Sequence, residues 1–276
     1  MTVAVLTDGA AGLTAEVAGD AGLVLIPMWV TIGETSRRDA EVPLDELVRR
    51  FDEGVTTAGP SPGDVRQAIE GVLGPEGALV VTVASRMSGS SQAARLAASE
   101  LGDRVRVFDS GVAAGAQALV ALAAAERAAA GATLDEVEAT ARNVAGRVRL
   151  LASLGSLDRL VRSGHVPEVV AWAGRSLGLR PIVEFRAGRV RPLRPARTVE
   201  AVIDRLLAEC RKHRPPEGTL HAISMHAGTE EPARRLAEAV DRGFGAHTLV
   251  SPFNAVMVAH TGPDLFGLAW WWEEPG

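Results

Sequence analysis

The alternation of short β-branched runs with helical patterns in the first 110 residues constrains the fold of this chain most strongly. We expect extended segments at 3–7, 23–31, 78–83 and 104–108, and helices at 43–53, 61–73 and 91–101. Apolar strands separated by helices are typical of a parallel sheet with helices on both faces. Such sheets bind ligands at the carboxyl ends of their strands. The first half is therefore predicted to be an α/β domain.

The pattern changes near residue 150. Two helices are expected first, at 112–130 and 133–149, and Thr133 with Glu136 has the spacing of a capping box. The later elements are strands 179–185 and 189–193, helix 198–213, strand 219–225, helix 231–242 and strand 246–251, followed by a final segment from Asn254. The short loop containing Gly188 is typical of an antiparallel hairpin. We predict an α/β domain at 1–150 and an α+β domain with a mainly antiparallel sheet at 151–276.

Composition excludes several classes of protein. The net charge is −5 and no basic run occurs, which argues against a nucleic-acid partner. The single cysteine, Cys210, allows neither a disulfide framework nor a cysteine-based metal site within one chain. The start resembles a buried strand rather than a signal peptide, and the alanine-rich stretch 112–130 contains Gln117, Glu126 and Arg127. We expect a cytoplasmic protein without stable membrane insertion.

Two polar segments are candidates for binding a ligand. The segment 56–63, TTAGPSPG, places Ser61 and Pro62 where a helix cap and a first helical residue would stand. The segment 85–92, SRMSGSSQ, follows a strand and opens a helix, where hydroxyls and free amides meet the positive helix end. This pattern favours a carboxylate or a single phosphate over a triphosphate. Capping without any ligand is the favoured interpretation of 56–63 taken alone, and for 85–92 it stands level with an anion site.

Strong catalytic and metal-binding motifs are absent from the sequence. GxSxG, HExxH and GxGxxG do not occur, and the histidines show no ligand spacing. Asp8 and Asp109 each end a predicted strand, where they would serve as turn caps or as paired acid and base groups. His260, in AHTGPDLFG, follows an apolar run. We predict no catalytic residue, no metal and no cofactor.

Eight segments in order resemble the motifs of the DegV family. They are TDGAAGL at 7–13, IPMWVTIG at 26–33, TTAGPSPGD at 56–64, SRMSGSSQAA at 85–94, VFDSGVAAGAQALV at 107–120, LASLGSLDRLVRSGHV at 151–166, LGLRPIVEFRAGRV at 177–190 and HTGPDLFGLAW at 260–270. The resemblance covers essentially the whole chain. It implies two domains with a ligand cleft between them that holds a long-chain fatty acid as the ligand.

The resemblance also implies the binding residues and a partner. Thr57 and Ser88 match hydroxyls that bind the fatty-acid carboxylate, and His260 matches the histidine of the family's HTGPG-like turn. The full set of implied ligand-binding residues is Thr57, Ser88, Gly89, Ser90, His260, Thr261, Gly262 and His165. Related bacterial proteins present the fatty acid to a separate fatty acid kinase, which makes an acyl phosphate. A fatty acid kinase subunit is therefore the expected partner.

Departures from the family pattern keep other functions open. Ala58 and Gly59 stand where the family has side-chain donors, and His165 stands where it has an arginine. We consider three hypotheses: a fatty-acid carrier, a binder of another small anionic or lipid ligand, and an enzyme. The enzyme would be a hydrolase or phosphotransferase with Ser88 as nucleophile, His260 as base and Asp8 or Asp109 orienting that base. The carrier hypothesis is favoured.

Overall fold

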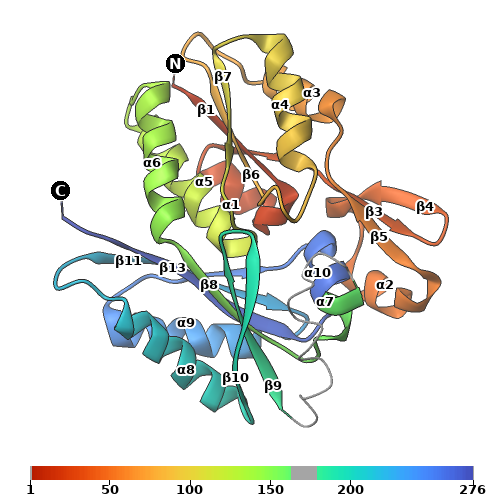
Figure 1. Ribbon diagram of the computed structural model, residues 1–276, viewed down its shortest axis with the longest axis vertical. Coiled ribbons are helices and arrows are strands. Elements are labelled where there is room, and N and C mark those ends of the chain that lie inside the picture. Colours follow the sequence, from red (N-terminus) through yellow and green to blue (C-terminus); the bar gives the residue numbers. More distant parts are fainter. Residues whose placement is uncertain (1, 163–178, 276) are drawn as a thin grey trace.

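A computed structural model describes residues 2–162 and 179–275, which form three β-sheets with helices around them (Figure 1). The order of strands is β2-β1-β6-β7 in the first sheet, β4-β3-β5 in the second and β10-β9-β8-β13-β11-β12 in the third. The parallel sheet lies at one end of the molecule and the six-stranded sheet at the other. The predicted fold class is confirmed.

The four-stranded sheet is wholly parallel, as the sequence predicts. Its strands are β1 (Ala4–Asp8), β2 (Leu23–Ile26), β6 (Ala78–Thr82) and β7 (Val105–Asp109). Helices cover both faces; they are α1 (Ala15–Asp20), α3 (Pro62–Glu70), α4 (Ser90–Leu101), α5 (Ala114–Ala129) and α6 (Leu134–Arg147). Leu6 and Val80 pack in one core with α3 and α4, whereas Val5 and Leu79 pack in another with α5. Neighbouring residues of a strand therefore point to opposite helical layers.

The predicted extended segment 23–31 is wrong as one element, because it contributes to two sheets. After β2 the chain passes Pro27, which has no amide hydrogen for a strand ladder, and Met28 donates its amide to the Asp39 carboxylate at 3.0 Å. A small antiparallel sheet follows, made of β3 (Trp29–Ile32), β4 (Thr35–Arg38) and β5 (Val55–Ala58). The predicted helix at 43–53 is shorter, with α2 (Leu44–Arg49) followed by a 3-10 turn, Phe51–Glu53.

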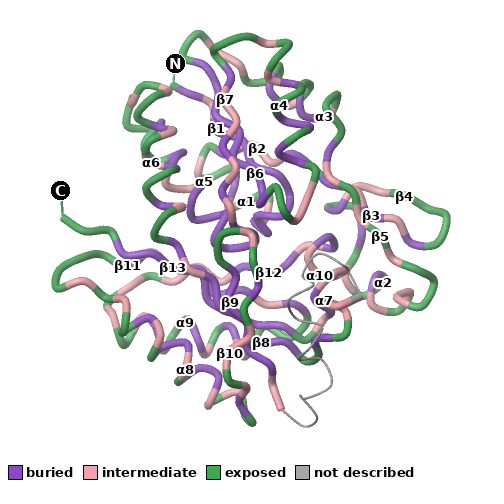
Figure 2. The backbone as a smooth tube through the Cα atoms, in the orientation of Figure 1, coloured by how far each residue is buried: buried purple, intermediate pink, exposed green. Residues whose placement is uncertain are grey.

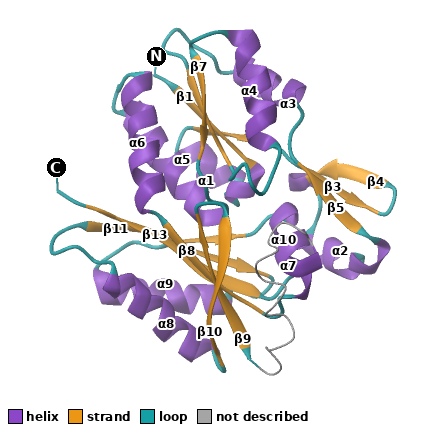
Figure 3. Ribbon diagram, in the orientation of Figure 1, coloured by secondary structure: helices purple, strands orange, loops and turns teal. Residues whose placement is uncertain are grey.

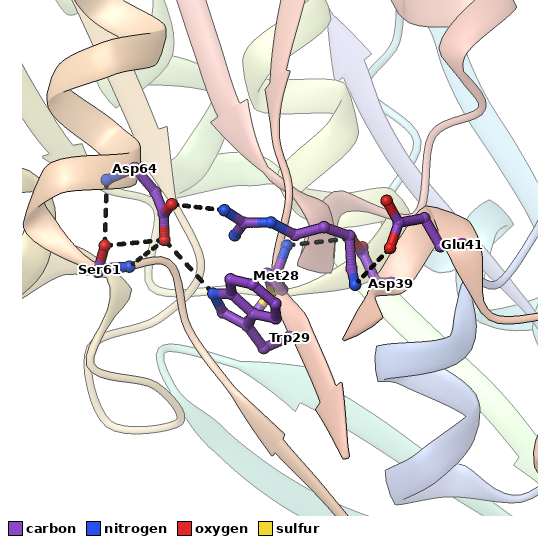
Figure 4. A network of polar contacts seen from close by, with 7 residues as sticks. Met28, Trp29, Asp39, Glu41, Ser61 and Asp64 are labelled. Atoms are coloured by element: carbon purple, nitrogen blue, oxygen red, sulfur yellow. Dashed lines mark hydrogen bonds and ion pairs between the residues drawn. The ribbon is translucent and has the colours of Figure 1, made fainter. Parts of the chain in front are cut away.

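A polar network ties this small sheet to the start of α3 (Figure 4). The Asp64 carboxylate accepts hydrogen bonds from Arg38 Nη2 at 2.5 Å, from the Ser61 amide at 2.9 Å and from Trp29 Nε1 at 3.4 Å. The Arg38 guanidinium also lies 3.7 Å from the centre of the Trp29 ring. Ser61 caps α3 in the predicted way, and the network fixes the loop between β5 and α3.

The six-stranded sheet is antiparallel except where β11 pairs with β12. Its strands are β8 (Arg149–Leu154), β9 (Arg180–Arg186), β10 (Arg189–Ala196), β11 (Thr219–Ala227), β12 (Leu249–Pro252) and β13 (Leu265–Glu273). The predicted hairpin is present, with a turn of two residues, Ala187 and Gly188, both at positive φ. A turn of this length with two positive φ angles suits the twist of a hairpin. The other helices are α7 (Asp158–Arg162), α8 (Val199–Lys212), α9 (Glu231–Phe244) and α10 (Ala255–Thr261).

Helix α5 lies between the two large sheets, which explains its alanine content (Figures 2 and 3). A Cβ atom on Gly115 would lie only 2.6 Å from Met225 Sδ of β11, so the helix approaches that strand closely. One continuous core includes Val5, Val120, Ala152 and Ala269, from both parts of the chain. The domain boundary near residue 150 stays a prediction. Within the described residues, no helix combines the length and apolarity needed to cross a membrane.

Candidate functional site

A cavity of about 270 Å³, here called the site cavity, collects residues from both halves of the chain. Its polar lining residues are Thr57, Ser88, His260 and Thr261, and its other lining residues are Ala10, Met28, Ala58, Gly59, Val83, Met87, Gly89, Ala113, Leu160, Phe185, Val256 and Met257. An apolar lining with a few polar groups is typical of a site for an amphipathic small molecule. A larger groove, of about 890 Å³ between α5, α6 and β11, contains none of the predicted site residues.

Thr57 and His260 form the polar contact that joins the two halves within the site cavity. Thr57 Oγ1 lies 2.8 Å from His260 Nε2, so one of these atoms donates a hydrogen bond to the other. Thr57 belongs to β5 and His260 to α10. Asn254 caps α10 and donates through Nδ2 to the Gly9 carbonyl at 2.6 Å and to Asp39 Oδ2 at 2.8 Å. These bonds hold α10, and His260 with it, against the N-terminal half.

Ser88, Gly89 and Ser90 lie where β6 leads into α4, in a loop here called the serine turn (residues 85–91). The Ser88 and Ser90 hydroxyls are 2.9 Å apart, and Ser88 Oγ also accepts the Ser90 amide at 3.2 Å. Ser90 is buried behind Ser88, which is half-buried. A Cβ atom on Gly59 would be 3.2 Å from Ser88 Oγ and 2.9 Å from Ser90 Oγ. Gly59 therefore allows the strand that carries Thr57 to approach the serine turn.

Asp8 supports this part of the site from below the surface. Its buried carboxylate accepts hydrogen bonds from the amides of Ala10 at 3.1 Å and Val83 at 2.9 Å, and from Gln117 Nε2 at 2.9 Å. Burial raises the pKa of the Asp8 carboxyl, while these donors oppose that rise. Because Ala10 and Val83 both line the site cavity, Asp8 connects two of its walls.

Asp109, the other carboxylate singled out in the sequence, has a capping role. It accepts the amides of Ser85 at 3.2 Å and Gly111 at 2.9 Å. The hydrogen bonds described above pair His260 with Thr57, and Ser88 with Ser90. Both aspartates are thus bonded to backbone amides, and Asp8 also to Gln117. For Asp109, this is the turn-capping role predicted from the sequence.

The remaining predicted residues are placed as follows. Thr261 lines the site cavity, and its hydroxyl donates to the Met257 carbonyl at 2.9 Å. Gly262 ends α10 with a φ of 80° and borders a neighbouring cavity of about 350 Å³, together with Thr261. His165 lies outside the described residues. Among the described residues, no group of three or more His, Cys, Asp and Glu side chains is arranged to hold a metal ion.

The apolar lining was not foreseen from the sequence. Only one part of it carries a readable signal, which is the helical spacing of Val256 and Met257 before His260 and Thr261. These four residues share one face of α10 because positions four apart in a helix lie one above the other. Other lining residues, such as Met28 between β2 and β3 and Phe185 in β9, come from distant parts of the chain, so their approach depends on the tertiary fold.

Comparisons with known proteins show which family the chain is similar to. The family model described as "Uncharacterised protein, DegV family" matches residues 2–273. A DegV domain-containing protein of Streptomyces coelicolor is 32% identical over 273 residues, which cover 96% of this chain and 97% of that protein. A protein of Thermotoga maritima named fatty acid-binding protein is 25% identical over 279 residues, covering 97% and 96%.

A solved structure shares the whole fold. It is described as the fatty acid binding of a DegV family protein from Thermus thermophilus, and it is similar to this chain with a TM-score of 0.92 and 26% identity. The similarity covers 99% of this chain and 100% of that one. With a family match over nearly every residue and relatives of full length, the chain belongs to the DegV family.

Proposed function

We propose that this protein binds a long-chain fatty acid in the site cavity and holds it without changing it chemically. The observation that carries the proposal is the Thr57–His260 contact within a mostly apolar cavity. A carboxylate bound by Thr57, Ser88 and His260 would accept charge-assisted hydrogen bonds, worth roughly 1.5–3 kcal/mol each. The fatty-acid binding named for the Thermotoga and Thermus relatives supports the same ligand class.

The tail would supply most of the affinity. At about 0.8 kcal/mol for each buried CH₂ group, a tail of about sixteen carbons contributes roughly 10 kcal/mol before ordering costs. The side chains of Met28, Met87 and Met257 line the site cavity. Methionine side chains adapt to irregular shapes, so this lining suits acyl chains that differ in length or bend.

The head group would lie close to the protein surface. Ala58 and Gly89 both line the site cavity and are exposed, whereas Ser90 behind them is buried. A carboxylate at this position is accessible to a second protein. We infer that the chain presents the fatty acid to a separate fatty acid kinase, which would supply the nucleotide-binding site.

Native mass spectrometry of the purified protein, followed by extraction and identification of any bound lipid, tests the ligand. We expect one fatty acid per chain. Thr57→Val, which removes the hydroxyl but keeps the shape, should weaken fatty-acid binding about tenfold. Thr56→Val is the matched control, because Thr56 lies next along β5 and is exposed. An empty protein that also fails to bind added C14 to C18 fatty acids would refute the proposal.

The kinase step has a separate test. A fatty acid kinase subunit with ATP and labelled fatty acid should form product only when this protein is present, and Ser88→Ala should reduce that product. Ser99→Ala is a suitable control, since the Ser99 hydroxyl bonds within α4 to the Leu96 carbonyl at 2.7 Å. Product formation at the same rate without this chain would contradict the role as presenter while leaving fatty-acid binding intact.

A further inference from the structure

A second cavity lies on the outer side of the serine turn. This outer cavity, of about 560 Å³, is lined by Ser85, Arg86, Met87, Ser88, Gly89, Ser91, Gln92 and Arg95. It shares Met87, Ser88 and Gly89 with the site cavity. The serine turn therefore forms a wall between an apolar cavity and a polar one.

The outer cavity lies at the start of α4, where the helix has no side-chain cap. The cap residue is Gly89, and α4 continues for 12 residues. Across residues 2–162 and 179–275, no hydrogen-bond acceptor pairs with the amides of Ser91 and Gln92. Free amides and the positive end of a helix of this length attract an anion.

Ser91 gives a second, independent indication that an anion binds here. Ser91 lines the outer cavity, the residue is only 2% exposed, and its hydroxyl has no hydrogen-bond partner in the part of the chain that the structure describes. A buried hydroxyl without a partner costs free energy, and native proteins keep few of them. A bound oxyanion would accept a hydrogen bond from this group.

Two arginines supply positive charge at the same place. The side chains of Arg86 and Arg95 line the outer cavity, and neither forms an ion pair within the described residues. Arg86 packs on the β9–β10 turn, because a Cβ atom on Gly188 would lie 3.0 Å from Arg86 Cδ. That turn is itself fixed by a hydrogen bond from the Gly188 amide to the Gly111 carbonyl at 2.6 Å. The Arg86 side chain is thus held beside the cavity.

The Asp109 carboxylate, which bonds to the amide of Ser85 at the edge of the outer cavity, forms no ion pair with Arg86 or Arg95 within the described residues. The Asp109 carboxylate accepts hydrogen bonds from the amides of Ser85 and Gly111, so its oxygens already have donors. Two guanidinium groups, a buried hydroxyl and two free amides suit a group with several oxygens and two negative charges.

We propose that the outer cavity binds a single phosphoryl group. A triphosphate is disfavoured because the turn has no lysine and lacks the glycine spacing of a phosphate loop. The phosphoryl group comes either from free phosphate or from a lipid whose tail occupies the site cavity. The lipid source rests on the proposed function, because its tail would occupy the site cavity, which shares the wall at Ser88 with the outer cavity. Binding of free phosphate does not depend on the proposed function.

The test compares inorganic phosphate, hexadecyl phosphate and hexadecanoate on the full-length protein by titration calorimetry. We expect either inorganic phosphate to bind by itself or hexadecyl phosphate to bind at least tenfold more tightly than hexadecanoate. The first result assigns the site to free phosphate and the second to a phosphorylated lipid. If neither occurs, the proposal is wrong.

Variants then locate the binding. The double change Arg86→Gln and Arg95→Gln should weaken the phosphoryl ligand at least tenfold, and Ser91→Ala should weaken it several-fold, with hexadecanoate binding unchanged. Arg104→Gln removes one charge near the other end of α4, where Arg104 donates to the Gly74 carbonyl, and should have no effect. Unchanged phosphoryl binding in both the arginine double variant and Ser91→Ala overturns the proposal. If the wild-type protein binds inorganic phosphate but does not bind hexadecanoate, that result counts against the fatty-acid proposal and not against this one.

Discussion

The Thr57 hydroxyl and the His260 ring are in hydrogen-bond contact at 2.8 Å although 203 residues separate them in the sequence. The contact depends on β5 at the edge of the small sheet and on α10, which Asn254 fastens to the N-terminal half. Both residues line the site cavity. The contact therefore positions two ligand-binding groups relative to each other, and it also links the two halves of the molecule.

A double-mutant cycle on these two residues should show coupling. Thr57→Val and His260→Ala each remove one partner, and we expect each to raise the Kd of a fatty acid about tenfold. The double variant should lose less than the product of the single effects, because the second change removes a group that has already lost its partner. Competition binding with a fluorescent fatty acid measures all four proteins. Strictly multiplicative effects would show that the two residues act independently.

A second prediction concerns Gly59, which allows β5 to approach the serine turn. Gly59→Ala places a methyl group 2.9 Å from Ser90 Oγ, so the turn has to move. Because Gly59 is not at positive φ, the backbone itself tolerates alanine. We expect about tenfold weaker fatty-acid binding with a change below about 1 kcal/mol in the free energy of unfolding.

Gly63→Ala is the matched control for this change. Gly63 lies in α3, and its added methyl would make only an ordinary contact at 3.7 Å with Ser61 Oγ. Alanine in a helix should stabilise the protein slightly without affecting the ligand. Equal ligand affinity in Gly59→Ala and wild type would mean that the serine turn does not contact the head group.

Much of the framework of the site could be predicted from local patterns. The capping boxes at Ser61 and Thr133 identify two helix starts, because each requires only residues three apart in the sequence. The hairpin around Gly188 was also readable, since a glycine in a short loop between two strand patterns readily adopts the positive φ that such a turn needs. These features depend on short-range physical chemistry, which a single sequence contains.

The elements that bring the site together were not readable in the same way. The predicted helix 133–149 ended at Arg149 and no element was predicted for 150–154, yet Arg149–Leu154 forms β8, between β9 and β13 in the six-stranded sheet. Its run of leucines fits a buried strand and a buried helix equally, so the choice depends on distant partners. The strands β4 and β5 were missed as well, and with them the reason for the place of Thr57 beside α10.

Replacing the buried Asp8 should lower the free energy of unfolding. Asp8→Asn keeps the shape but replaces one carboxylate oxygen with an NH₂ group, which then faces a backbone or side-chain donor. We expect the free energy of unfolding at pH 7 to fall by about 1–3 kcal/mol, as for other buried donors that lose an acceptor. Urea denaturation measures the change. Asp20→Asn, at an exposed position, should be close to neutral, and an equally stable Asp8→Asn would show that the three donors do not need the carboxylate.

The Asp64 carboxyl should make the free energy of unfolding depend on pH. The Arg38 guanidinium, 2.5 Å away, together with the donors at Ser61 and Trp29, holds the pKa of the Asp64 carboxyl well below its usual range. In the unfolded chain this carboxyl takes up a proton near its ordinary value of 3.8, whereas in the folded protein it stays ionised to lower pH. Its stabilising contribution is therefore complete above about pH 5 and is lost as the pH falls through the ordinary value towards the folded one.

Urea denaturation of wild type and Asp64→Asn between pH 7 and pH 3 tests this sign. We expect Asp64→Asn to be less stable by about 1–2 kcal/mol at pH 7, because both side chains of the Arg38 pair are partly exposed and screening limits the effect. The difference should stay constant down to pH 5 and shrink below it. Asp45→Asn breaks the Arg49 pair at the same 2.5 Å distance, but those side chains are 71% and 66% exposed, so its effect should be small at every pH. A difference between wild type and Asp64→Asn that does not change with pH would mean that the low pKa of Asp64 does not contribute to folding, and that the Arg38 contact acts only by shaping the loop before α3.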